Sequence, residues 1–129
     1  MRAGWTTCFA MVIGLLLASA PALGHHGNSD YDLKNQVTLR VTVTDFLFIN
    51  PHSFIKFTVQ NEQGKAEEWQ GELPSPGLLS RRAGWTKDTV KPGDQITVIG
   101  SPAKNGSHAM QIKKIVLANG QEMPGTMIS

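Results

Sequence analysis

Four histidines are the residues of this chain best suited to binding chemistry, and two of them, His25 and His26, are adjacent. The segment before them is typical of a signal peptide removed after Gly24, so His25 would begin the mature chain. A terminal histidine can offer its α-amine and one ring nitrogen to the same metal ion. Nitrogen-rich planar coordination suits Cu(II), so the start of the chain predicts a copper site.

The other two histidines could complete this site. His52 follows the Asn50-Pro51 turn, and His108 follows the Asn105-Gly106 turn. We expect these loops to flank one face of a small barrel. The predicted ligands are the amine and ring of His25 with His52, and His26 or His108 as a third imidazole. The alternative is that the paired histidines are solvated and that His52 only bonds its own turn.

Cleavage one residue earlier would change the coordination but not the metal. A mature chain that begins at Gly24 would carry His26 as its third residue. A histidine in that position forms another amine-and-amide chelate that suits Cu(II). Copper is therefore the one cofactor that the sequence predicts.

The first 24 residues predict export. Arg2 precedes an apolar run from Cys8 to Ala18, and small residues at Ala22 and Gly24 fit a signal-peptidase site. The alternative is a retained membrane anchor, but this run is shorter than the roughly 20 apolar residues that a spanning helix needs. We therefore expect a periplasmic or secreted protein that is not integral to the membrane after cleavage.

The mature chain of 105 residues is long enough for one domain. The only cysteine of the full sequence, Cys8, would leave with the signal peptide, so the mature chain is expected to have no disulfide and no thiolate metal site. It carries 11 basic and 10 acidic residues, so it lacks the charge excess of a nucleic-acid binder. The expected partner is a small ligand or an envelope protein.

Hydrophobic alternation predicts a barrel of five strands. Val37–Thr44 places valine and leucine on one face, and the phase slips at Asp45, as it does at a β-bulge. A second slip lies at Lys113-Lys114. The other predicted strands are Ser53–Gln60, Lys65–Leu73, Gln95–Ser101 and His108–Leu117.

A short helix over Gly77–Gly84 is predicted between the third and fourth strands, closed by its final glycine. This order matches a small five-stranded OB-like barrel, a mainly β fold. The alternatives are a plain β-sandwich and a lipocalin-like barrel, whose eight strands do not fit. The expected parts are an extended arm at 25–36, the barrel at 37–123 and a loose tail at 124–129.

The sequence does not display a catalytic constellation. Ser53 stands beside His52, but a catalytic triad depends on geometry that adjacency does not supply. Glu67 and Glu68 point to opposite faces of one strand, so they do not form a paired acid and base. We therefore expect a binding protein, with enzymatic activity as the remaining alternative.

A set of short motifs resembles a family of small secreted bacterial proteins known only as a domain of unknown function. The resemblance implies a periplasmic OB-like domain and no particular activity. One departure is Asn28, where the family pattern has an aromatic residue. The matching motifs are His25-His26, Phe46 to Ser53, Trp69, Ser75 to Leu79, Gly84 to Thr86, Lys91 to Asp94, Gly100 and Ala103 to Gly106.

Overall fold

Strand β1 (Val37–Leu47) connects two parts of the sheet in the computed structural model, which describes residues 30–126. Its first half pairs with β4 (Gln95–Pro102) and its second half with β2 (Ser53–Gln60). Val41 and Val43 face the core, as the alternation predicts. The register with β2 then shifts between Val43 and Asp45. This shift is the predicted bulge, and it lets β1 bend from one neighbour to the next.

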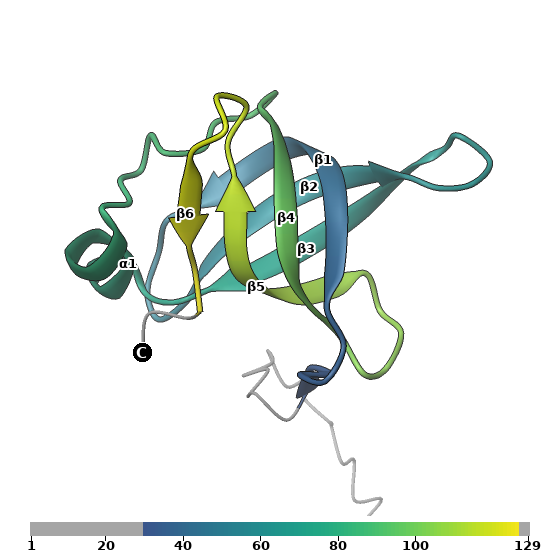
Figure 1. The fold of residues 1–129 in the computed structure, drawn as a ribbon, viewed down its shortest axis with the longest axis horizontal. Helices are drawn as coiled ribbons and strands as arrows, with labels where there is room; N and C mark the ends of the chain where they lie inside the picture. The colour runs from purple at the N-terminus through teal and green to yellow at the C-terminus, as the bar shows by residue number, and fades with distance from the viewer. Residues whose placement is uncertain (1–29, 127–129) are drawn as a thin grey trace, which may run out of the picture.

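The barrel closes through a parallel pairing. Strand β3 (Ala66–Leu73) pairs antiparallel with β2 and parallel with β5 (Ala109–Val116). The strands β3-β2-β1-β4-β5 therefore form a closed five-stranded mixed barrel (Figure 1). This connectivity confirms the predicted OB-like fold. The second predicted bulge is also present, because Lys113 has no opposite residue in β4 where the β4–β5 register shifts.

Helix α1 (Pro76–Ala83) lies between β3 and β4, within one residue of the predicted range. It begins where the Ser75 hydroxyl accepts a hydrogen bond from the Leu78 N–H at 3.3 Å. It ends at Gly84, whose φ of 72° is left-handed and favours glycine. Leu79 is fully buried, so the helix contributes to the core on the side of the barrel away from the β2–β3 hairpin (Figure 1).

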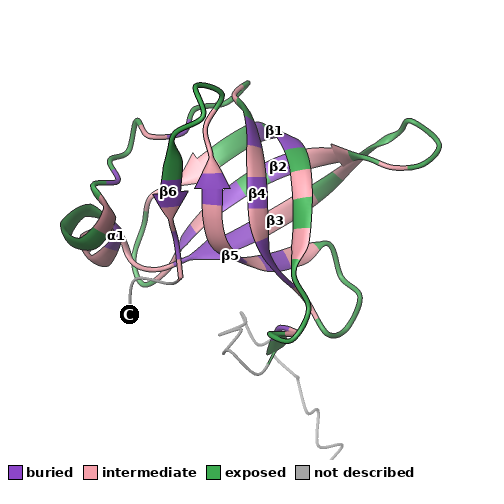
Figure 2. Ribbon diagram, in the orientation of Figure 1, coloured by how far each residue is buried: buried purple, intermediate pink, exposed green. Residues whose placement is uncertain are grey.

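Buried and exposed residues alternate along the strands (Figure 2). The interior is aliphatic with two large aromatic residues, and it includes Leu79 from the helix and Trp85 after it. No helix within residues 30–126 is long and apolar enough to span a bilayer. The predicted signal peptide lies outside the described residues. The buried core residues are Val41, Val43, Ile55, Phe57, Leu73, Leu79, Trp85, Val90, Ile96, Val98, Met110, Ile112, Ile115 and Met123.

The chain after β5 is tied to the sheet up to Thr126, more closely than the sequence indicates. A sixth strand, β6 (Glu122–Pro124), pairs with β5, and the Gly125 and Thr126 N–H groups donate to carbonyl oxygens of β5. The Trp85 indole N–H also donates to the Pro124 carbonyl at 2.8 Å. The first part of the expected loose tail, residues 124–126, is therefore hydrogen-bonded to the sheet, and residues 127–129 lie outside the described part.

Candidate functional site

Tyr31 connects the segment before the barrel to the barrel itself. Its backbone forms an antiparallel bridge with Ala103, just beyond β4. Its side chain is only 2% exposed, and its hydroxyl donates to Oε2 of Glu72 at 2.5 Å. Tyr31 falls within the predicted arm at 25–36, so the last part of that arm is packed on the barrel and is not a free extension.

The same carboxylate also contacts an imidazole. Nδ1 of His52 lies 3.5 Å from Oε1 of Glu72. The Glu72 side chain is almost fully buried, whereas the His52 side chain is 44% exposed. We call Tyr31, Glu72 and His52 the His52 corner. It combines one buried acid, one buried phenol and one accessible imidazole.

Burial sets the protonation of the phenol. Burial raises the pKa of Tyr31 well above its ordinary value, and its hydrogen bond and charge repulsion with Glu72 raise it further. Tyr31 is therefore a neutral donor at physiological pH. The contact with Glu72 engages one ring nitrogen of His52 and leaves Nε2 to other partners. Carboxylates orient metal-binding histidines in this manner.

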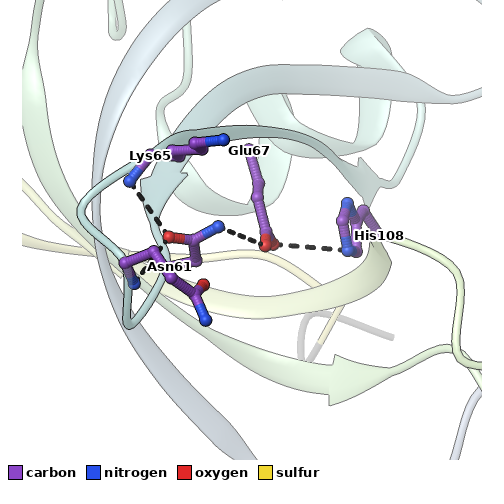
Figure 3. Close-up of polar contacts among 5 residues, drawn as sticks. Asn61, Lys65, Glu67 and His108 are labelled. Carbon is purple, nitrogen blue, oxygen red and sulfur yellow. Dashed lines mark hydrogen bonds and ion pairs between the residues drawn. The ribbon is translucent and has the colours of Figure 1, made fainter.

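His108 forms a separate group at the β2–β3 hairpin (Figure 3). Its Nε2 lies 3.3 Å from Oε2 of Glu67, and the Asn61 side-chain amide donates to Oε1 of Glu67 at 3.1 Å. Oδ1 of Asn61 accepts from the Lys65 N–H at 3.0 Å. The His108 ring also stacks on Trp69, with centroids 5.0 Å apart and planes 8° apart. These contacts fix an imidazole that is 49% exposed.

The structure does not bring His52 and His108 together. Their glutamate partners, Glu72 and Glu67, are five residues apart on β3, a distance of about 16 Å along a strand. An odd spacing also places the two side chains on opposite faces of the strand. Within residues 30–126, no three histidine, cysteine, aspartate or glutamate side chains gather as a metal site. The other predicted ligands, His25 and His26, lie outside the described residues.

Sequence reasoning missed two of the three members of the His52 corner. Glu72 gives no local signal, because a glutamate at the end of a strand is usually solvated. Tyr31 is the only tyrosine of the chain and stands between Asp30 and Asp32. A lone aromatic residue in so polar a segment is the one clue that this segment packs against something.

Comparison with curated proteins found no significant match, and comparison with solved structures found none either. A family model does match, over residues 12–111. This range covers most of the chain, from the predicted signal peptide into β5, and includes every member of the His52 corner and of the His108 group. The chain therefore belongs to the family of unknown function DUF6152.

Proposed function

We propose that this protein is an exported binding domain whose ligand is Cu(II), held by the mature amino terminus and His52. The observation that carries this proposal is the buried carboxylate of Glu72. It contacts the tyrosine that attaches the N-terminal segment and also the one accessible imidazole of that corner. The same residue therefore brings the segment that follows the predicted terminus next to a candidate ligand.

The length of the chain supports this arrangement. Five residues lie between His25 and Tyr31, and the six extended steps that join the two span at most about 20 Å. The Tyr31 hydroxyl and the His52 ring contact the two oxygens of one carboxylate. A terminal His25 thus has enough chain to reach Nε2 of His52.

The donor set fits the chemistry of copper. The α-amine and ring of His25 with Nε2 of His52 give three nitrogens, and His26 offers a fourth. Nitrogen donors in a planar arrangement favour Cu(II) over harder ions. His108 leaves the proposed set, because Glu67 holds it on the other face of β3.

Binding suits this corner better than catalysis. Tyr31 is 2% exposed and its hydroxyl is engaged by Glu72, so a substrate would not reach this phenol. His52 is then the only accessible titratable group of the corner. Export is proposed from the signal-like segment and places the protein in the periplasm or outside the cell.

The test uses the protein exported with its own signal segment and purified without an N-terminal tag. Intact mass spectrometry gives the first residue, and Cu(II) titration followed by electron paramagnetic resonance gives the affinity and the number of nitrogen ligands. We expect a chain that begins at His25 and binds one copper ion. One alanine inserted before His25 moves the amine, and we expect it to abolish tight binding.

The two histidines provide a matched pair of variants, because each is about half exposed and each contacts a glutamate of β3. We expect His52→Ala to weaken Cu(II) binding at least about tenfold and His108→Ala to leave it unchanged. Equal losses in both variants would contradict the proposed ligand set. A chain that begins at His25 and takes up no Cu(II) would contradict the metal and leave a binding domain for a small molecule or an envelope protein.

A further inference from the structure

A second candidate site lies away from the His52 corner, in a hollow of about 470 Å³ that crosses β2, β1 and β4 and reaches Ala66 of β3 and the end of β5. Six polar side chains contribute to its lining. They come from the centre of the sheet, where the three strands pair with one another. These residues are Arg40, Thr42, Thr58, Gln60, Gln95 and Thr97.

The strand register places these side chains on one face. Thr42 lies opposite Thr58 of β2 and opposite Gln95 of β4. Arg40 lies two residues before Thr42 and opposite Thr97. Since Val41 and Val43 alternate with them and face the core, the polar row occupies the other face of the sheet.

This row has no partners of its own. Within the described part of the chain, none of the six side chains forms a hydrogen bond or an ion pair with another residue. Among the described residues that line the hollow, Arg40 alone carries a charged side chain. Among residues 30–126 the hollow therefore offers one guanidinium without an ion-pair partner, beside hydroxyl and amide groups that can donate and accept. Apolar residues make up the other half of the lining.

We propose that this hollow binds an acidic saccharide, with the carboxylate on Arg40 and the hydroxyl groups on the threonines and glutamines. A guanidinium binds a carboxylate through two parallel hydrogen bonds, which fixes the orientation of the ligand. The volume lies within the usual range of small-molecule sites. A single arginine and a nearly neutral chain favour one carboxylate over a polyphosphate or a nucleic acid.

The site is independent of copper. It shares no lining residue with the His52 corner, so loss of metal binding would not affect it. Its two glutamines supply a direct readout, because side-chain amides of glutamine are resolved in proton–nitrogen correlation spectra. We would titrate the exported, isotope-labelled protein with digalacturonic acid, and in parallel with neutral galactobiose and with acetate.

We expect digalacturonic acid to shift the side-chain amides of Gln60 and Gln95 in a saturable manner. Arg40→Gln should weaken this binding about tenfold or more, the usual loss when a charged hydrogen-bonding partner is removed. The matched control is Arg82→Gln, since Arg82 is an exposed arginine on α1 and lies outside the hollow. Arg82→Gln should leave the affinity unchanged.

Three results would overturn the proposal. The first is the absence of saturable shifts at the glutamine amides up to the solubility limit of the probe. The second is an equal response to acetate alone, which would mean that only a free anion binds. The third is an equal loss of affinity in Arg40→Gln and Arg82→Gln. Thr97→Val provides a second test that keeps the charge, and it should weaken binding of the acidic and the neutral disaccharide alike.

Discussion

Replacement of Tyr31 by phenylalanine tests the contact on which the His52 corner depends. The Tyr31 hydroxyl donates to Oε2 of Glu72 at 2.5 Å, and Glu72 is only 6% exposed, so water cannot replace the lost donor freely. Removal of a hydrogen bond to a buried charged group costs about 1.5–3 kcal/mol. Phenylalanine keeps the packing of the ring. We therefore expect Tyr31→Phe to lower the free energy of unfolding by about 2 kcal/mol at neutral pH.

The same variant should change the pH dependence of stability. Burial and Glu72 raise the pKa of Tyr31 in the folded protein above its ordinary value of 10.0. Below about pH 10 the folded and the unfolded protein both keep the phenol proton, so the hydrogen bond to Glu72 contributes fully to stability. At higher pH only the unfolded chain loses the proton, and stability falls by up to about 1.4 kcal/mol per pH unit. Tyr31→Phe lacks this loss, so the two stability curves should converge above about pH 10.

The assay is urea denaturation of the exported wild-type and variant proteins between neutral and alkaline pH, followed by tryptophan fluorescence. Tyr31 is the only tyrosine, so the tyrosinate absorbance of the folded protein reports this residue alone. The structural reasoning would be refuted by a variant within about 0.5 kcal/mol of wild type, the usual range of surface substitutions. A tyrosinate transition at the ordinary pKa in the folded protein would refute it equally.

Urea denaturation at neutral pH also tests three other sites. In Gly71→Ala the new Cβ would lie 2.3 Å from Cδ1 of Ile112 and 3.2 Å from Cε1 of Phe57, so we expect a loss of about 1–3 kcal/mol from overpacking. Ser75→Ala removes the N-cap of α1 and should cost about 1 kcal/mol. The Ser53 hydroxyl is buried and has no hydrogen-bond partner among the described residues, so Ser53→Ala should leave stability unchanged or raise it. A clear loss of stability in Ser53→Ala would reveal a partner for this hydroxyl.

The barrel could be predicted because its signals are local. Hydrophobic alternation in β1 places Val41 and Val43 on the core face. The break in this alternation after Val43 marks the bulge at which β1 bends and pairs with a second strand. The slip in alternation at Lys113 likewise marks a bulge in β5. Gly84 likewise marks the end of α1 by its backbone preference, whereas the N-cap Ser75 lies two residues before the predicted start.

Two features could not be predicted: a strand too short to show a periodic pattern, and a contact between residues far apart in the sequence. Strand β6 has three residues, too few for a periodic pattern, and its position depends on backbone hydrogen bonds to β5. Tyr31 and Glu72 are 41 residues apart in the sequence. Their contact requires the bridge at Ala103 and the parallel β3–β5 pairing, neither of which leaves a trace in either segment.

His52 and His108 show how the fold separates residues that the sequence presents as equivalent. Each follows a turn, each is about half exposed and each contacts a glutamate of β3. The odd spacing of Glu67 and Glu72 places the two imidazoles on opposite faces, so one metal ion cannot bind both. Of the two glutamates, only Glu72 also binds Tyr31. If the signal peptide is removed before His25, the mature amino terminus is six positions before that tyrosine. The distinction between the two histidines therefore follows from one tyrosine hydrogen bond, which is why Tyr31→Phe should also weaken Cu(II) binding through His52 while His108 keeps its contacts.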